Sequence, residues 1–149
     1  MMTKIITLFI LSLVLFSCGT YSEEQKKSFD QQIVTYLKKK DIKCNRTESG
    51  MYYKIIEPGT GEFIQFTDIV SFSYKGSFLN GQTFDNHHYP VEFAVKDLIG
   101  AWKEIMLELK PGAKAFLVAP PTLGYGDRDL EDIPPNSILV FEMEIKGVK

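Results

Sequence analysis

The segment at residues 70–85 constrains the fold more than any other part of this 149-residue chain. Apolar and polar residues alternate from Val70 to Lys75, which is the period of a strand with one buried face. Asn80-Gly81 separates this run from a second one that ends at Phe84-Asp85. Because both residues of an Asn-Gly pair tolerate positive φ, the pair predicts a β-hairpin. The hairpin would bring Tyr74 and Phe84 towards one surface of a sheet, beside a carboxylate.

The remainder of the chain adds further strand patterns and one helical pattern. Strands are predicted at residues 51–56, 91–95, 113–119 and 138–148. Between the second and third of these, apolar residues recur at the spacing of one helix face, and Pro111-Gly112 ends the helix. The residues on that face are Leu98, Trp102, Ile105, Met106 and Leu109. The predicted fold class is α+β, a twisted antiparallel sheet wrapped over a short central helix.

Residues 1–17 have the pattern of a secretory signal peptide, with Lys4 followed by an apolar run from Ile5 to Phe16. The run is too short for a membrane span, which needs about 20 residues. Leu15-Phe16-Ser17-Cys18 resembles the bacterial lipobox, in which cleavage precedes a cysteine that is then acylated, although Phe16 is bulkier than usual there. We expect a lipoprotein of the bacterial cell envelope, anchored to a membrane through Cys18 and facing the periplasm or the cell surface. A signal anchor or plain secretion is the alternative.

The chain contains two cysteines, Cys18 and Cys44. If Cys18 carries the lipid, Cys44 has no cysteine partner within one mature chain. The alternative is a disulfide between the two, which would require that Cys18 is not acylated.

Residues 18–50 are predicted to form a tether that contains one helix. Ser22 and Gln25 have the spacing of a capping box, and three lysines at 38–40 suit the carbonyl end of a helix. Its apolar stripe is narrow and consists of Phe29, Ile33, Tyr36 and Leu37. The stripe could bind a partner or a second copy, but its narrowness favours a helix that packs on the chain's own domain. Residues 41–50 are polar and predict a linker to a domain at residues 51–149.

The sequence offers little support for metal, cofactor or nucleic-acid chemistry. The net charge of −2 gives no general attraction to nucleic acid. The chain has no CxxC, HExxH, nucleophile elbow or phosphate-binding loop. His87 and His88 are adjacent, so in an extended chain they would point to opposite sides. The acidic segment 127–132 lacks the pattern of an EF-hand. No metal and no cofactor are therefore expected.

The remaining candidates for function are aromatic: Tyr74, Phe84, Trp102, Tyr125 and Phe141. By themselves they would be interpreted as core residues. Their motifs, however, resemble those of the FK506-binding-protein family of peptidyl-prolyl cis-trans isomerases, or rotamases. The motifs are Tyr74-Lys75-Gly76 with Phe84-Asp85 after the hairpin, Leu98-Ile99-Gly100-Ala101-Trp102, Leu123-Gly124-Tyr125-Gly126, and the segment from Ile133 to Glu142. The resemblance covers residues 51–149.

The resemblance implies an enzyme that rotates X–Pro bonds in proline-containing polypeptides and so assists the folding of exported proteins. Trp102 would form the floor of the site, and Tyr74, Phe84 and Phe141 its walls. Tyr125 would donate its hydroxyl, and Ile99 its backbone N–H, to the substrate. The implied site also includes Asp85 near the substrate carbonyl, and Val91, Leu98 and Ile133 as substrate-binding residues. Macrolides of the FK506 type would be further ligands.

Several positions depart from the family pattern. Val91 replaces an aromatic residue, and the basic residue that pairs with the aspartate is absent, with His87 or His88 nearby. The loop at 126–132 is shortened and acidic, and the link at 94–98 is trimmed. The second hypothesis is therefore a catalytically weak binding module or chaperone for one exported or cell-surface partner.

Overall fold

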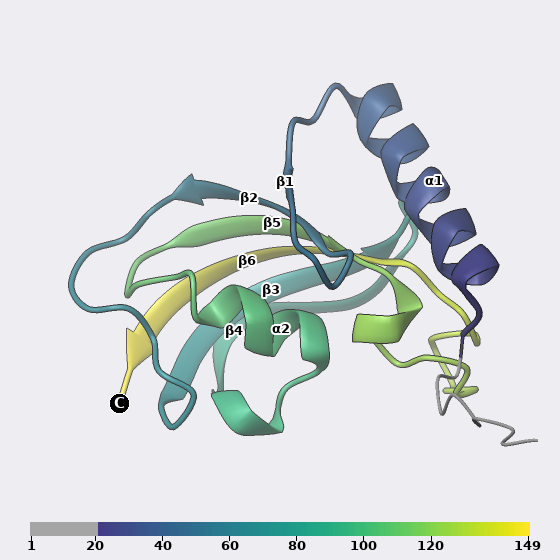
Figure 1. Cartoon of the computed structure of the whole chain (residues 1–149). Coiled ribbons are helices and arrows are strands. Elements are labelled where there is room, and N and C mark those ends of the chain that lie inside the picture. Colours follow the sequence, from purple (N-terminus) through teal and green to yellow (C-terminus); the bar gives the residue numbers. More distant parts are fainter. Residues whose placement is uncertain (1–20) are drawn as a thin grey trace, which may run out of the picture.

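An antiparallel six-stranded sheet with the strand order β1-β2-β5-β6-β3-β4 curves around a short helix, α2 (Figure 1). This computed structural model describes residues 21–149. The elements are α1 (Glu23–Lys40), β1 (Asn45–Arg46), β2 (Tyr52–Glu57), β3 (Ile69–Phe78), β4 (Thr83–Ala94), η1 (Val95–Asp97), α2 (Gly100–Met106), β5 (Lys114–Ala119), η2 (Pro121–Leu123) and β6 (Leu139–Val148). The predicted α+β fold is confirmed. The predicted signal peptide and Cys18 lie outside the described residues.

The predicted hairpin is formed by β3 and β4, and its turn differs in detail from the expectation. Of the Asn-Gly pair only Gly81 adopts a positive φ, at 88°. The Gly81 N–H donates to the carbonyl of Phe78, and the Phe78 N–H donates to that of Gln82. Asn80 instead accepts the N–H of Gln82 with its side-chain oxygen, at 2.9 Å. This is a type I turn closed by a glycine bulge, which needs one left-handed residue rather than two.

β4 extends the whole length of β3, whereas the sequence predicted two separate strands here, one that ends at Phe84-Asp85 and a short one at residues 91–95. Its register passes from Tyr74↔His87 to Phe72↔Val91, so residues 88–90 bulge opposite Ser73. The bulge contains a proline, Pro90, which cannot donate to a ladder. It is tolerated because β4 is the edge strand of the sheet.

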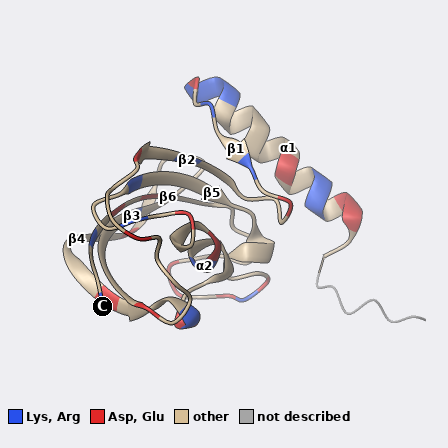
Figure 2. Ribbon diagram, turned by 60° about the vertical axis from the view of Figure 1, so that its left-hand side comes forward, with Lys and Arg blue, Asp and Glu red and all other residues tan. Residues whose placement is uncertain are grey.

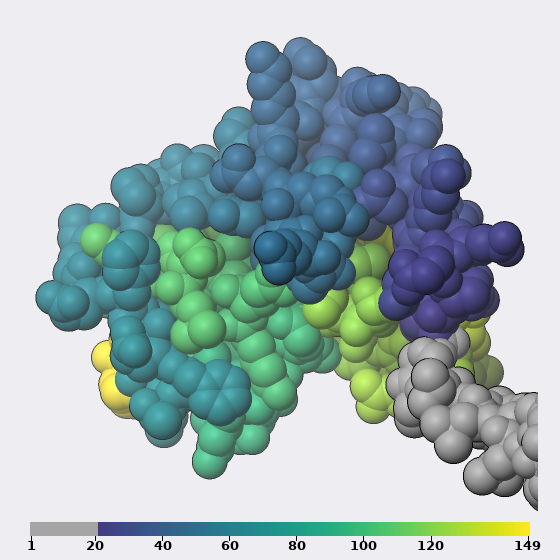
Figure 3. All heavy atoms as spheres, viewed as in Figure 1, coloured from purple at the N-terminus to yellow at the C-terminus, as the bar shows by residue number. Residues whose placement is uncertain are grey.

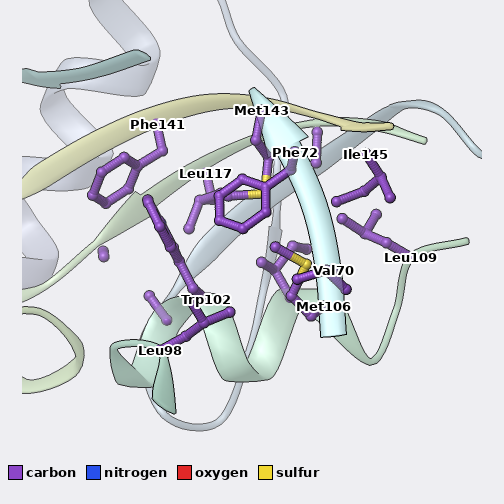
Figure 4. Packing of buried hydrophobic residues seen from close by; sticks show 14 of the residues in the cluster. Val70, Phe72, Leu98, Trp102, Met106, Leu109, Leu117, Phe141, Met143 and Ile145 are labelled. Atoms are coloured by element: carbon purple, nitrogen blue, oxygen red, sulfur yellow. The ribbon is translucent and has the colours of Figure 1, made fainter. Parts of the chain in front are cut away.

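The main core lies between the concave face of the sheet and α2 (Figure 4). The alternation predicted for the last strand is confirmed, because Leu139, Phe141, Met143 and Ile145 are all buried. The helix is shorter than predicted. Leu98 precedes it, and Leu109 follows it, yet both side chains are buried in the same core.

A second core lies on the outer face of the sheet, where α1 packs. The capping box at Ser22 and Gln25 is present as predicted. Ile33 is completely buried, and it belongs to one cluster with Val118 and Val140 of β5 and β6. The helix thus packs on its own domain, which is the interpretation that its narrow stripe favoured.

The linker predicted at residues 41–50 is wrong for Asn45–Arg46, which form β1 and pair with β2. The Arg46 side chain holds this strand against α1, because its Nε donates to Asp30 Oδ1 at 2.9 Å. The hydroxyl of Tyr52 in β2 donates to the same oxygen at 3.0 Å. A two-residue polar strand has no periodicity of its own, so its sequence could not reveal it.

Charged residues of both signs are distributed over the surface and along α1 (Figure 2). Within residues 21–149 no helix is both long enough and apolar enough to cross a membrane. The same residues contain no group of three or more His, Cys, Asp or Glu side chains arranged to hold a metal ion.

Candidate active site

Trp102 of α2 is the centre of an aromatic cluster on the concave face of the sheet. Its ring centroid lies 4.7 Å from that of Tyr74 and 4.9 Å from that of Phe141, and both pairs meet edge to face. This is the geometry that the charge distribution of aromatic rings favours. Phe72, which the sequence analysis did not assign to the site, meets the same indole edge-on at 5.2 Å. Figure 4 shows Trp102 extending from α2 towards Phe141 on the sheet.

The indole N–H of Trp102 is buried and has no hydrogen-bond partner among the described residues. The Trp102 side chain is itself only 7% exposed. Leaving such a donor unsatisfied costs about 1–3 kcal/mol. The centre of the cluster is therefore less well satisfied than a purely structural core would be.

Phe84 forms one side of the cluster and explains the glycine of the Tyr-x-Gly motif. Its ring centroid lies 5.8 Å from that of Phe141, again edge to face. A Cβ atom at Gly76 would lie 2.6 Å from Phe84 Cζ and 3.1 Å from Phe141 Cε1. Only glycine leaves room for both rings over β3 at this position.

Tyr74, Asp85 and His87 form a polar group at the edge of the cluster. The Tyr74 hydroxyl donates to Asp85 Oδ2 at 2.5 Å. Burial and this carboxylate raise the pKa of Tyr74 well above its usual value. The other oxygen, Asp85 Oδ1, lies 3.2 Å from His87 Nε2. His88 lies instead beside Asn86, at 3.1 Å. The structure therefore identifies His87 as the residue beside the aspartate, which the sequence could not decide.

Tyr125 lies in the loop after η2 and packs half-buried against the same core. Burial, and then the nearby Asp85 carboxylate, raise the pKa of its hydroxyl. The Asp85 carboxylate thus raises the pKa of both tyrosines. The Tyr125 hydroxyl stays protonated near neutral pH and can act as a hydrogen-bond donor.

The remaining predicted site residues lie in or against this core. Leu98 and Ile133 are buried in it, while Val91 and Ile99 pack against it half-buried. The N–H of Ile99, directly before α2, donates to no carbonyl within residues 21–149. The structure thus brings the predicted pocket residues to one side of the sheet.

Cys44 stands apart from this site. Cys18 lies outside the described residues. Cys44 is half-buried against the outer core, and burial raises the pKa of its thiol.

The model of the family described as FKBP-type peptidyl-prolyl cis-trans isomerase matches residues 60–146. FkpA of Escherichia coli K12, itself named an FKBP-type isomerase, is 38% identical over 117 residues, which cover 76% of this chain and 43% of FkpA. FkpA of Buchnera aphidicola from Baizongia pistaciae is 39% identical over 80% of this chain and 48% of its own length. The chain thus spans about half the length of the curated relatives it matches.

Solved structures show the same similarity. The crystal structure of FkpA from Escherichia coli has a TM-score of 0.71 at 31% identity and covers 85% of this chain, with 63% of the FkpA chain aligned. A peptidyl-prolyl cis-trans isomerase from Pseudomonas syringae also has a TM-score of 0.71, at 27% identity, covering 88% of this chain and 99% of its own.

Proposed function

Because the chain belongs to the FKBP-type peptidyl-prolyl cis-trans isomerase family, we propose that it catalyses rotation about X–Pro bonds in polypeptide clients. The family membership predicted from the motifs is thereby confirmed. The observation that carries it is the aromatic cluster around Trp102, whose flanking residues Tyr74 and Phe84 remain half-exposed.

The proposed mechanism needs no covalent step. Amide resonance creates a rotation barrier of about 18–20 kcal/mol, and uncatalysed X–Pro exchange takes tens to hundreds of seconds. At the twisted transition state the resonance is lost and the carbonyl becomes less polar. An apolar site that excludes water therefore stabilises the twisted state more than the planar one. The proline ring would rest on Trp102, between Tyr74 and Phe141.

Polar groups at the edge of the cluster would orient the client backbone. Tyr125 has a protonated hydroxyl at neutral pH, and the Ile99 N–H has no partner within the described residues. Both are donors for client carbonyls. Asp85 accepts from Tyr74 and lies beside His87, so in this scheme it fixes the Tyr74 ring as a wall and contributes a negative charge near the bond.

A protease-coupled assay on a short X–Pro–Phe peptide tests the activity. Trp102→Leu should reduce kcat/KM most, because it removes the floor of the site. Tyr125→Phe should reduce it about two- to tenfold, the range for one neutral hydrogen bond. Tyr36→Phe, on the helix of the outer face, is the matched control and should leave the rate unchanged.

Failure of the folded protein to accelerate any X–Pro peptide would reject the isomerase proposal and favour the binding module. The same site is the proposed location for macrolides of the FK506 type. Quenching of Trp102 fluorescence on titration with FK506 would measure their affinity, since the chain contains one tryptophan.

We propose the lipid anchor at Cys18 from the sequence pattern, and the length of chain after it limits how far the domain can lie from the membrane. Cys18 and Tyr21 are three positions apart. That length of chain spans at most about 11 Å. The anchored domain would therefore sit close to the membrane, near the clients of an envelope protein. Mass spectrometry of the membrane fraction should find an acylated Cys18 at the amino terminus, and retention of residues 1–17 on an unmodified Cys18 would reject the anchor.

A further inference from the structure

The residue directly before the N-cap of α1 is docked on the far end of the chain. Tyr21 donates its hydroxyl to Asn136 Oδ1 at 2.8 Å, and its ring meets Phe29 edge-on at 5.3 Å. Its side chain is only 8% exposed. Figure 3 shows the purple N-terminal end of α1 against the yellow-green segment that follows β5. This contact anchors the beginning of the described chain on the loops of the candidate site.

Asn136 connects Tyr21 to the loop that carries Tyr125. Its backbone has a φ of 63°, a left-handed conformation that asparagine tolerates better than most residues. In this conformation its N–H donates to the Gly126 carbonyl at 2.8 Å, and the Gly126 N–H donates to Pro121 at 3.0 Å. Tyr21 is therefore two hydrogen bonds away from the carbonyl of Gly126, the residue that follows Tyr125.

Beyond Tyr125, which packs against the core, the exposed tip of this loop has little apolar packing to hold it in place. Residues 127–132 are exposed, and Tyr125 and Gly126 are half-buried. A groove of about 430 Å³ runs beside the loop, and Tyr21 and Lys26 from the N-terminal segment line it together with Tyr125 and Arg128. The N-terminal segment and the loop thus form one continuous surface next to the proposed donor.

We propose that Tyr21 is a positioning residue for Tyr125, so that the N-terminal segment completes the active site instead of serving only as a tether. The inference rests on the proposed isomerase function, because its consequence for activity passes through the Tyr125 hydroxyl. Its physical cause is simple: a hydrogen bond to Asn136 limits the positions of a loop that its own side chains hold weakly.

The structure provides a matched pair of variants. Tyr21→Phe and Tyr52→Phe each remove one hydroxyl from a nearly buried ring, 8% and 9% exposed respectively. Each also removes one hydrogen bond that links the N-terminal segment to the domain, from Tyr21 to Asn136 or from Tyr52 to Asp30. Tyr52 lies on the outer core, away from the loop. A purely structural role for Tyr21 would make the two variants equivalent.

In the full-length protein we expect Tyr21→Phe to lower kcat/KM on an X–Pro peptide about two- to tenfold, as loss of one neutral hydrogen bond allows. Most of the loss should appear in kcat, because Tyr125 would be displaced during bond rotation. Tyr52→Phe should lose comparable thermal stability and retain its rate. Equal kcat/KM for the two variants would overturn the inference.

A double-mutant cycle tests the route through Asn136. Asn136→Gly removes the acceptor oxygen and keeps a residue that tolerates positive φ. It should reproduce the loss seen in Tyr21→Phe, and the double variant should be no slower than either single one. Additive losses would show that Tyr21 acts by another route.

Amide hydrogen exchange separates this inference from the proposed function. Tyr21→Phe should speed exchange at the Gly126 and Asn136 N–H groups relative to Tyr52→Phe, whether or not the protein is an isomerase. Faster exchange in a protein without activity would reject the proposed function and keep the structural link. Unchanged exchange together with unchanged kcat/KM would reject the link in an active isomerase.

Discussion

The two faces of the sheet are both covered by apolar residues and a helix, but they differ in how their polar groups are satisfied. On the outer face, α1 buries Ile33 completely against the strands, and Asp30 satisfies the polar groups of both Arg46 and Tyr52. On the inner face, α2 leaves the Tyr74 ring half-exposed and the indole N–H of Trp102 without a partner in the described chain. The outer core also has half-buried rings, Phe29 and Tyr36, so the faces differ in their polar groups. Those of Arg46 and Tyr52 have a partner, whereas the indole N–H of Trp102 has none within residues 21–149.

This difference separates stability from function within one sheet. A closed, satisfied face contributes burial and hydrogen bonds to folding, and a ligand has nothing to add there. A face with an unpartnered buried donor gives up some of that stabilisation, and in the proposed mechanism a bound client would restore part of it. The comparison predicts that substitutions on the outer face change stability alone, whereas those on the inner face change activity as well.

The largest expected effect is on the outer face. Ile33→Ala removes a fully buried side chain and should lower the free energy of unfolding by about 2–5 kcal/mol, measured by urea denaturation. The kcat/KM of the folded fraction should remain that of the wild type. Gln31→Ala, at an exposed position on the same helix, is the control. If Ile33→Ala lowered the kcat/KM of the folded fraction as well as the free energy of unfolding, the prediction that the outer face affects stability alone would be wrong.

Gly76→Ala should give an intermediate effect on the inner face. The added Cβ would lie 2.6 Å from the Phe84 ring, so the ring must move, at a cost of about 1–3 kcal/mol for overpacking. The kcat/KM of the folded protein should fall as well, because Phe84 forms a wall of the proposed site. Gly147→Ala in β6 is the matched control, since its Cβ would meet nothing closer than Ser71 Cβ at 3.9 Å. Equal activity in the two variants would mean that Phe84 does not shape the site.

The smallest effect concerns alkaline pH. Burial and Asp85 raise the pKa of Tyr74 above the ordinary tyrosine value of 10.0. The unfolded chain therefore loses this proton first, and the stabilisation, complete below pH 10, declines as pH rises above it. Tyr74→Phe should make that decline shallower, by less than the roughly 1.4 kcal/mol per pH unit that one proton allows, because the half-exposed group is partly screened by water.

Urea denaturation at pH 9 and pH 11 measures this change in slope. Tyr36→Phe on the outer face should alter the slope less, because that tyrosine makes no side-chain hydrogen bond to a carboxylate. An identical slope for Tyr74→Phe and the wild type would contradict the proposed coupling between Tyr74 and Asp85.

The sequence by itself determined the features that depend on neighbours along the chain. The alternation of β3 and β6, the capping box at Ser22 and the glycine of the hairpin turn are local patterns with a local physical cause. The motifs also predicted that Tyr74 and Phe141 lie with Trp102, whereas Phe72, which meets the same indole, was not predicted. These predictions succeeded because strand period, helix capping and turn conformation are set by a few consecutive residues.

Only the tertiary structure decided the contacts between distant segments. The pairing of β1 with β2, the choice of His87 over His88 beside Asp85, and the bond from Tyr21 to Asn136 have no local signature. Tyr21 and Asn136 are 115 positions apart, and the position of His87 depends on the register of β4 against β3, which pairs it with Tyr74. Such contacts depend on how whole elements dock and on strand register, which a pattern of consecutive residues does not specify.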